Sequence, residues 1–581
     1  MKKSKIINFK DKYAIILGLF FIFLFWFIIS FIILPNIEIL KTVFFTGDGL
    51  SFDNIKKIFA SNRAIKGVLN SFLLAIVLPI TVSIVGILEV LFIDYFDIKG
   101  RKIISICYMV PLVFGGIMFA SGYVFTYGSR GMITRILTEI FPNLPIDWFR
   151  GFWAVLFIMT FGCTTNYLMF FRNSLQNIDY QTIEAAKGMG ASDFLILRKV
   201  VLPTLKPMIL TCLILLFQTG LMAFSAPLLV GGKDFETISP LILTFSQRPN
   251  SRALAAILSL FLGLFQLLLL LVIRRSERKG NFLSVSKAKT QLKRAKINNK
   301  VVNIIAHIVA YIFAVINILP LLLVFLFSFT NYSAIARREL DFSSFSLDNY
   351  IKILTDSTAY KPFLISVSYS AISAIIAVIL MMVTARFVFK SKSKFGALLE
   401  FLVHIPWVLP SLMFGLGLLL TYSKPNIMVL NKILTGSLVL MLVAYIVVML
   451  PNTFRFIKAS YFSVDSNLED AARNLGANPI FTYVKVVLPV ILPTVLAMLA
   501  LNFNGKLGDY DLSVFLYNPS AQPVGVVIRN NTNPDIGPEG IAMNFVYTII
   551  LTIINALVIF FIYADGKNKI TRLFKRGKKN V

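Results

Sequence analysis

Two short segments of the chain combine an acidic side chain, two alanines and a glycine at the same spacing. The first is Glu184-Ala185-Ala186 followed by Gly190, and the second is Asp470-Ala471-Ala472 followed by Gly476. The carboxylate supplies a charge for docking, and the alanines favour helix while leaving room for a partner surface. Glycine is the usual residue just past a helix end. Because the small alanines let a partner surface come close, the pattern predicts a segment that docks on another protein.

Each segment is predicted to fold as a helix-turn-helix. Asp179 is placed to cap the first helix of one copy, and Ser466 to Glu469 have the spacing of a capping box in the other. A second short helix is expected after the glycine, and Leu202-Pro203 or Leu488-Pro489 then marks a break before the next apolar run. The acid, alanines, glycine, leucine and proline match in register in both copies, which argues against ordinary loops.

A second group of polar residues is expected at membrane depth, where polar side chains are functional candidates. They are Gln218 in one apolar run, and Asn502, Asn504, Asp509 and Asp511 in or just beyond the matching run of the second copy. Carboxylates at this depth suit a hard cation as passing cargo. The alternative is that Asp509 and Asp511 lie in an outer loop as solvated or capping residues.

No metal site is predicted. The cysteines and histidines are isolated and lack the spacing of metal ligands: Cys107, Cys163, Cys212, His307 and His404. The cysteines are interpreted as small buried apolar residues. Glu89, near the inner end of an apolar run, is expected to be interfacial or paired with a cation.

The composition indicates a membrane protein. The chain of 581 residues is 57% hydrophobic and 15% charged, whereas soluble domains are about 45–50% apolar and about 25% charged. Apolar runs longer than about 18 residues recur, and each can cross the hydrocarbon core as a helix. The predicted fold class is an all-α polytopic membrane protein with about twelve transmembrane helices. The candidate spans are approximately 13–35, 68–93, 103–126, 151–172, 206–230, 253–273, 301–329, 363–389, 398–421, 433–454, 490–504 and 541–564.

The duplication extends beyond the two acidic segments. Ser71 matches Ser366, and Met118-Phe119 matches Met413-Phe414, at a second common offset in residue number. With six spans in each half, the halves are predicted to be parallel repeats related by an axis along the membrane normal. The predicted domains are a first repeat at 1–273 with its core at about 65–273, a basic linker at 274–300, and a second repeat at 301–581 with its core at about 361–564.

The basic residues indicate how the chain is oriented. The net charge is +29, but 38 of the 57 Lys and Arg residues lie in the two terminal segments and in alternate loops. The positive-inside rule produces this distribution, so both termini and both acidic segments are predicted on the cytoplasmic side. Nucleic acid is excluded as a partner for the same reason. The linker is interpreted as a solvated connection, with binding to lipid headgroups as the alternative.

The spacing from Glu184 to Pro203 resembles the coupling-loop signature of type I ABC importer permeases. The second copy departs from it only in having Asp470 where the signature prefers Glu, and the charge is kept. The fused twelve-span form is most similar to the ferric iron uptake permeases. This resemblance implies a multi-pass protein of the bacterial cytoplasmic membrane. It implies two copies of an ABC ATPase docked on the two coupling helices, and an extracytoplasmic solute-binding protein that delivers cargo for alternating access.

The sequence contains no G-x-x-x-x-G-K-[ST] phosphate-binding loop, since Gly505-Lys506 and Gly566-Lys567 are followed by Leu and Asn. The chain is therefore predicted not to be an enzyme and to bind no cofactor, with ATP and Mg held by the partner ATPase. Ferric iron is the favoured cargo; thiamine, phosphonate, polyamine and phosphorylated sugar are the alternatives. A secondary transporter driven by an ion gradient is the alternative of another class, and it would not need the duplicated helix-turn-helix.

Overall fold

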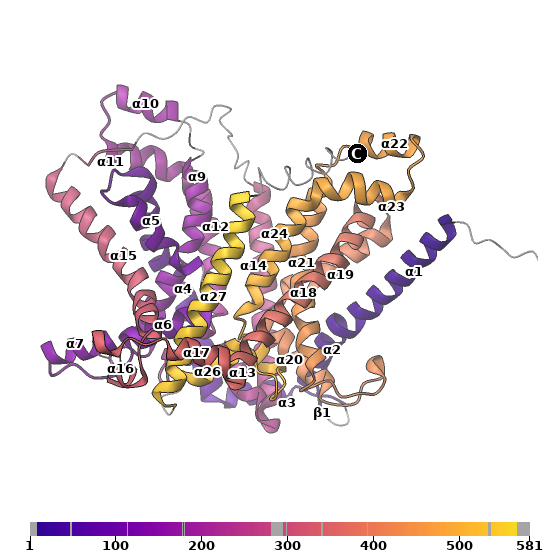
Figure 1. The fold of residues 1–581 in the computed structure, drawn as a ribbon, viewed down its shortest axis with the longest axis horizontal. Coiled ribbons are helices and arrows are strands. Elements are labelled where there is room, and N and C mark those ends of the chain that lie inside the picture. Colours follow the sequence, from indigo (N-terminus) through magenta and orange to yellow (C-terminus); the bar gives the residue numbers. More distant parts are fainter. Residues whose placement is uncertain are drawn as a thin grey trace, which may run out of the picture.

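A computed structural model describes residues 9–46, 49–112, 114, 116–129, 131–176, 178, 180–279, 294–297, 299–337, 341–391, 393–532 and 536–565. The regular structure within these ranges is helical, apart from the two-residue strands β1 (Phe45–Thr46) and β2 (Gly49–Leu50), which pair antiparallel. The long helices run between two ends of one bundle (Figure 1).

The described part of the first half contains fourteen α-helices: α1 (Phe9–Ile28), α2 (Leu34–Phe44), α3 (Asp53–Ala60), α4 (Asn62–Val90), α5 (Arg101–Met109), α6 (Gly116–Tyr127), α7 (Met132–Ile140), α8 (Phe152–Cys163), α9 (Arg172–Gln176), α10 (Tyr180–Gly188), α11 (Asp193–Ile196), α12 (Leu202–Leu221), α13 (Ile238–Ser246) and α14 (Arg252–Lys279). The second half contains α15 (Lys300–Ser328), α16 (Tyr332–Arg337), α17 (Asp348–Thr355), α18 (Ser357–Ser391), α19 (Lys394–Val408), α20 (Ser411–Tyr422), α21 (Leu438–Tyr461), α22 (Ser466–Asn474), α23 (Pro479–Thr482), α24 (Leu488–Leu507), α25 (Ser513–Leu516), α26 (Val524–Asn531) and α27 (Pro538–Asp565).

Among the described residues, ten helices are long and apolar enough to cross a membrane, and two bent helix pairs raise the number to twelve. The prediction of an all-α membrane protein with about twelve spans is confirmed. The expected spans at 103–126 and 398–421 are not continuous helices, however. In the second of them α19 and α20 meet at an angle of 100°. The break falls at Leu409, which is extended because a following proline, Pro410, disfavours helical backbone.

The predicted break at Leu202-Pro203 and Leu488-Pro489 is absent. A π-helical turn, η5 (Leu197–Val201), joins α11 to α12, and η10 (Tyr483–Val487) joins α23 to α24, without a non-helical residue between them. A local π-helical adjustment lets a membrane helix accommodate a proline, and each of these prolines comes just after the π-helical turn. Each short helix at the bundle end therefore runs directly into a membrane helix.

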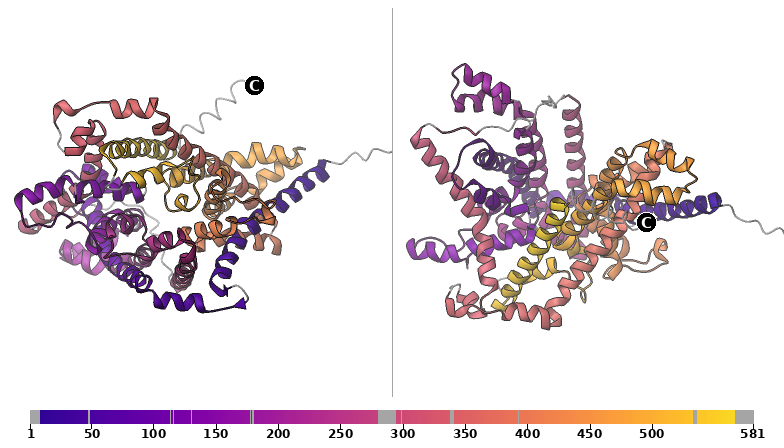
Figure 2. Two further views of the ribbon diagram at one scale, coloured as in Figure 1. Left: turned by 90° about the horizontal axis from the view of Figure 1, so that it is seen from below. Right: turned by 45° about the horizontal axis from the view of Figure 1, so that its top comes forward.

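The first helices of the two halves are exchanged. α1 and α2 lie along the second half, and α15 lies along the first (Figures 1 and 2). α2 packs on α20, and the Tyr422 hydroxyl of α20 donates at 2.8 Å to the carbonyl of Ser30, in the π-helical turn between α1 and α2. α15 packs on α5 and α6, and the Tyr108 hydroxyl donates to the Ala310 carbonyl at 2.8 Å. Each half thus buries apolar surface against a helix of the other, which ties the halves together.

Glu89 is buried where the exchanged helix α15 meets α4. Its side chain is 0% exposed, and the Asn317 amide donates to Glu89 Oε1 at 3.0 Å. The expectation that Glu89 is interfacial or paired with a cation was wrong. Its partner is a neutral amide more than two hundred residues away, and nothing local in the sequence indicates that α15 crosses to the first half.

The duplicated Ser71 and Ser366 have the same structural role. The hydroxyl of Ser71 accepts from the N–H of Ile238 at 2.8 Å, and that of Ser366 accepts from the N–H of Val524 at 2.9 Å. These donors begin α13 and α26, two short helices at equivalent positions for which the sequence predicted no helix. The serines fix the two helices against α4 and α18, so the repeat extends to the end of the bundle opposite α10 and α22 (Figure 1).

Candidate functional site

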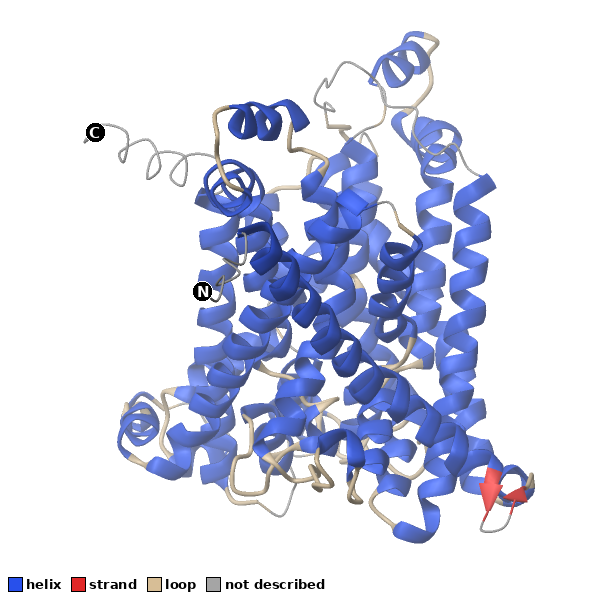
Figure 3. Cartoon of the chain, turned by 90° about the vertical axis from the view of Figure 1, so that its right-hand side faces the viewer, coloured by secondary structure: helices blue, strands red, loops and turns tan. Residues whose placement is uncertain are grey.

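Two helix-turn-helix segments project from one end of the bundle. The first comprises α10 and α11 (residues 180–196), and the second comprises α22 and α23 (residues 466–482). We call them the first and second coupling segments. They stand at the same end of the molecule, over different halves (Figures 1 and 3). The helix-turn-helix predicted from the repeated spacing is therefore present in both copies.

Gly190 and Gly476 form the turn of each coupling segment. Their φ angles are +81° and +82°, in the left-handed region that only glycine adopts without strain. In both, the glycine N–H donates to the carbonyl three residues earlier, at 2.9 and 3.0 Å. Nothing lies within 4 Å of a Cβ built on either residue. Backbone conformation, and not crowding within the chain, therefore requires glycine here.

The acidic residue and the first alanine face solvent in both segments. The exposed residues are Glu184, Ala185, Asp470 and Ala471. The second alanine faces the protein, since Ala186 is buried and Ala472 is half-buried. The carboxylate and one alanine are thus available to a partner, whereas the second alanine allows the helix to lie close to the bundle.

A large apolar side chain stands at the tip of each coupling segment, and the sequence analysis missed it. Met189 is 82% exposed and Leu475 is 88% exposed. They occupy equivalent positions, directly before the turning glycine. Apolar side chains exposed at matching positions are typical of a protein-binding surface. The sequence signal was a large apolar residue at the same position of both repeats, directly before the glycine, in turns that are otherwise polar.

The predicted leucine and proline residues lie at the base of the coupling segments. Leu202 and Leu488 are half-buried, whereas Pro203 and Pro489 are exposed. All four stand in the first turn of α12 or α24. They connect each coupling segment to its membrane helix and lie away from the exposed tip.

The first coupling segment rests on apolar side chains. Ile183 of α10 is only 3% exposed. It belongs to an apolar cluster that also contains four buried residues from outside α10: Leu91, Tyr95, Leu175 and Leu197. The Tyr95 hydroxyl also donates to the carbonyl of Asp193 in α11, at 3.2 Å. Apolar burial therefore holds this segment in place.

The second coupling segment rests on charged and aromatic side chains at the same repeat positions. Glu469, the counterpart of Ile183, is 7% exposed and pairs with Arg386 and Lys390 of α18. The Arg386 guanidinium lies 5.4 Å from the centre of the Tyr461 ring, and the Tyr461 and Tyr483 hydroxyls are 2.9 Å apart. We call these residues the ionic seat: Arg386, Lys390, Tyr461, Glu469 and Tyr483. Their counterparts in the first half are Leu91, Tyr95, Leu175, Ile183 and Leu197.

The capping box predicted from Ser466 to Glu469 does not form, because Glu469 turns towards α18. Asp465 caps α22 instead by accepting from the N–H of Asn467 at 2.9 Å; its counterpart Asp179 lies outside the described residues. Burial raises the pKa of Glu469, but hydrogen bonds and charge from Arg386 and Lys390 outweigh it and hold this pKa below its ordinary value. Glu469 is therefore ionised at neutral pH.

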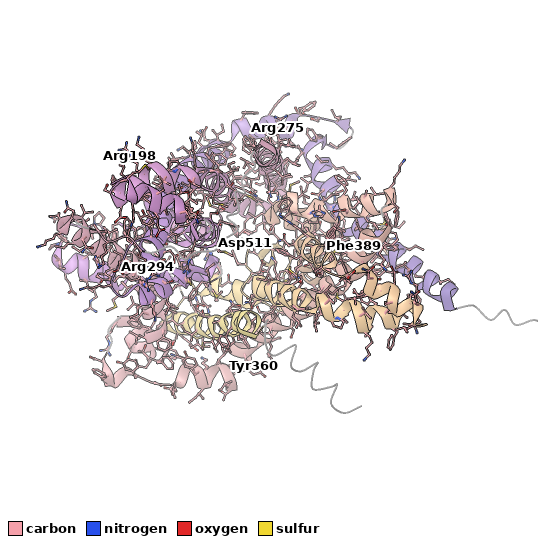
Figure 4. All side chains as sticks on the ribbon, turned by 90° about the horizontal axis from the view of Figure 1, so that it is seen from above. Arg198, Arg275, Arg294, Tyr360, Phe389 and Asp511 are labelled. Atoms are coloured by element: carbon pink, nitrogen blue, oxygen red, sulfur yellow. The ribbon has the colours of Figure 1, made fainter. Side chains whose placement is uncertain are left out.

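A cavity of about 470 Å³ lies where the two halves meet. We call it the axial cavity, and the lining residues that matter here are Gly116, Met118, Asn504, Asp509, Asp511 and Asn555. Phe224 and Tyr510, which are repeat counterparts, stack beside it with ring centres 5.6 Å apart and planes 14° from parallel. Seen from above, Asp511 lies between the two halves (Figure 4). The cavity is thus close to the pseudo-twofold axis.

The axial cavity brings together three of the five predicted path residues: Asn504, Asp509 and Asp511. Gln218 is half-buried on α12, and the lining does not include it. Asn502 is buried against α21, where its amide donates to the Thr453 hydroxyl at 2.8 Å. The assignment of these residues to a cargo path stays a prediction.

Asp509 has the capping role that the sequence analysis gave as an alternative. Its carboxylate accepts from the N–H groups of Leu512 and Ser513 at 3.2 and 3.1 Å, which begins α25. It also pairs with Lys506 at 2.7 Å. Within the described ranges, no three His, Cys, Asp or Glu side chains are grouped as a metal centre requires.

Parallel halves, about twelve spans and paired coupling segments define a multi-pass membrane transport component. Residues 95–282 and 382–564 match the family of binding-protein-dependent transport system inner membrane components. The chain belongs to this family. Each matched stretch contains one coupling segment, so the family match follows the internal repeat.

Relatives of this chain are permeases. A protein of Sinorhizobium fredii described as an ABC transporter permease is 34% identical, over 92% of this chain and 94% of its own length. A ferric transport system permease protein of Actinobacillus pleuropneumoniae is 21% identical, over 97% of this chain and 80% of its own length. A 2-aminoethylphosphonate transport system permease protein of Salmonella paratyphi A is 25% identical, over 41% of this chain and 83% of its own length. Proteins named for different cargoes are therefore similar to this chain, some over nearly all of it and others over less than half.

Proposed function

We propose that this chain is the permease subunit of an ABC importer and that two copies of a partner ATPase, which hold ATP and Mg, drive it. The observation that carries the proposal is the pair of coupling segments, each exposed at its tip and continuous with a membrane helix. A partner that moves the turn at Met189 or Leu475 also moves the short helix after it, α11 or α23, which continues without a break into α12 or α24. Closure of the ATPase pair would therefore shift one half against the other and alternate access to the axial cavity.

This proposal assigns the coupling end of the bundle to the cytoplasm. The 38 of 57 Lys and Arg residues that fall in the terminal segments and alternate loops support this orientation. Both termini would then be cytoplasmic, in a bacterial cytoplasmic membrane whose lipid surrounds the bundle. An extracytoplasmic solute-binding protein would dock at the opposite end, near α13 and α26 (Figure 1).

Ferric iron is the cargo that we propose first. The ferric transport system permease that aligns with 97% of this chain supports it, as do the two carboxylates that line the axial cavity. Phosphonate, polyamine, thiamine and phosphorylated sugar remain the alternatives. Membership of a binding-protein-dependent family argues against a secondary transporter driven by an ion gradient.

The coupling role is tested by charging the two exposed tips. We expect Met189→Glu combined with Leu475→Glu to abolish co-purification of the ATPase, because exposed apolar anchors at an interface each contribute about 2 kcal/mol or more. Phe342→Glu is the matched control, since Phe342 is 99% exposed and lies between α16 and α17 at the opposite end. ATPase that stays bound to the double variant, with uptake that runs without ATP, would disprove the proposal.

The cargo needs a separate test. The solute-binding protein that co-purifies with the full complex is titrated with ferric ion, thiamine, putrescine and 2-aminoethylphosphonate in parallel. We expect tightest binding of ferric ion. A clear preference for thiamine, putrescine or 2-aminoethylphosphonate would contradict the iron assignment while leaving the importer assignment intact.

A further inference from the structure

The polar groups around the axial cavity differ between the two halves. Asp509 and Asp511, its two charged lining residues, both belong to the second half. In the first half the repeat register places Ala223 opposite Asp509 and Ser225 opposite Asp511. Ser225 Oγ lies 3.2 Å from a Cβ built on the lining residue Gly116. The cavity therefore has a hydroxyl on one side of the axis and a carboxylate on the other.

Only one of the two carboxylates is free to act on a ligand. Asp509 is neutralised by Lys506 at 2.7 Å and its carboxylate caps α25. Asp511 forms no ion pair with any residue that the structure describes, and its neighbour across the axis is the Ser225 hydroxyl, which donates a hydrogen bond to it. The axial cavity thus holds one carboxyl group, that of Asp511, which pairs with no cation among the described residues.

The remaining hydrogen-bonding capacity of the cavity is of the acceptor kind. The Asn504 amide nitrogen donates to the Asn555 carbonyl at 3.3 Å, whereas Asn504 Oδ1 is buried without a hydrogen-bond partner. A buried acceptor that lacks a donor costs free energy until a ligand supplies one. Lys506, the cation closest in sequence to both carboxylates, is already engaged by Asp509 and lies over the Tyr445 ring.

We propose that the axial cavity binds a positively charged, hydrogen-bond-donating group of the cargo and that Asp511 selects for it. This inference rests on the proposed importer function and deepens it. A hydrated ferric ion and a primary ammonium group share this chemistry, because both present positive charge surrounded by donor hydrogens. The selecting carboxyl group, that of Asp511, belongs to the second half. The apolar side chains and the Ser225 hydroxyl on the opposite side of the cavity belong to the first half.

The test uses the complete complex of this chain with its ATPase and solute-binding protein in proteoliposomes. Uptake of ferric ion, putrescine and 2-aminoethylphosphonate is measured with Asp511→Asn, a change that keeps the shape and removes the charge. We expect uptake of the transported cation to fall about tenfold or more, as for loss of a charge-assisted hydrogen bond. Asp147→Asn is the control, because Asp147 is 64% exposed and lies away from the cavity, between α7 and α8.

An exchange variant separates selection from a merely structural role. Asp511→Ser combined with Ser225→Asp moves the carboxylate across the axis, and we expect it to recover uptake that Asp511→Ser alone loses. Loss of ferric uptake in Asp511→Asn assigns the site to the metal, and loss of putrescine or 2-aminoethylphosphonate uptake assigns it to an ammonium group. Undiminished uptake in Asp511→Asn, or no recovery in the exchange variant, would overturn the inference.

ATP hydrolysis distinguishes failure of this inference from failure of the importer assignment. If the importer assignment holds, the solute-binding protein stimulates hydrolysis in the wild-type complex and in Asp511→Asn alike, because the variant leaves both coupling segments intact. A wild-type complex that shows neither stimulated hydrolysis nor ATP-dependent uptake of any of the three probes would refute the proposed function, and the inference with it.

Discussion

The ionic seat leads to a prediction about how firmly the second coupling segment is held. Glu469→Ile places in the second half the residue found at the equivalent position of the first, Ile183. Isoleucine suits the apolar surroundings of Ile183 in the first half, but in the second half it leaves Arg386 and Lys390 without their partner. We expect α22 to open more readily, because the Arg386 guanidinium is then left partly buried and unpaired.

The size of the expected stability loss follows from the exposed fractions of the Arg386 and Lys390 side chains. Removing one partner of a buried ion pair costs about 3–5 kcal/mol, whereas exposed pairs contribute about 0–1 kcal/mol. The side chain of Arg386 is 16% exposed and that of Lys390 is 46% exposed, so the seat lies between these limits. We therefore expect a loss of about 2 kcal/mol in the opening free energy of α22, which is about a thirtyfold change in the opening equilibrium.

Amide hydrogen exchange of α22 in the purified full-length chain measures this directly, since exchange rates report local opening. Asp470→Asn is the control: Asp470 is 64% exposed and lies 3.8 Å from Arg473, and its loss is expected to change exchange little. The triple change Arg386→Leu, Lys390→Tyr and Glu469→Ile replaces the three charged residues by their first-half counterparts Leu91, Tyr95 and Ile183, and it should restore slow exchange. Unchanged exchange in Glu469→Ile, or fast exchange in the triple variant, would refute the reasoning.

Three further predictions concern the turns, pH and the exchanged helix. Gly190→Ala and Gly476→Ala should each cost about 1–2 kcal/mol of left-handed backbone strain, which faster amide exchange of the coupling segment will show. Leucine at either position should abolish uptake, while fractionation should show that the variant still inserts into the membrane. Because the pKa of Glu469 is lowered on folding, its contribution is complete above about pH 4.3 and is lost as the pH falls through the folded value; exchange should quicken in α22 and not in α10. Asn317→Leu should cost about 1–3 kcal/mol by removing a hydrogen-bond donor from buried Glu89, as thermal inactivation will show, and adding Glu89→Leu should recover stability.

Much of the architecture was accessible from the sequence because its signals are local. An apolar run of membrane-crossing length identifies itself without reference to any other part of the chain. The coupling segments were predictable because acid, alanines and glycine occur twice at one spacing, and a helix ended by a left-handed glycine needs only those neighbours. The helix breaks were less accessible: the chain bends at Leu409 but continues through Leu202-Pro203, because a π-helical turn just before Pro203 accommodates the proline.

The contents of the axial cavity were only partly predictable. Asn504, Asp509 and Asp511 could be singled out because polar residues near a membrane span are rare. The separate role of each of these residues could not be predicted. Whether a carboxylate caps a helix, pairs with a lysine or faces a ligand depends on where Lys506 and α25 are placed around it, and residue type alone leaves all three roles open.

The sequence by itself determined that this protein is a helical membrane protein, that it is built from two parallel repeats, and that each repeat carries one coupling segment. Run length, turn chemistry and internal repetition carry that information along the chain. Only the tertiary structure decided that α1–α2 and α15 change places, and that one coupling segment rests on apolar groups and the other on charges. It also decided that Asp509 pairs with Lys506 whereas Asp511 pairs with no cation among the described residues. These are contacts between residues far apart in the chain, and their energies come from burial and pairing that exist only once the helices are packed.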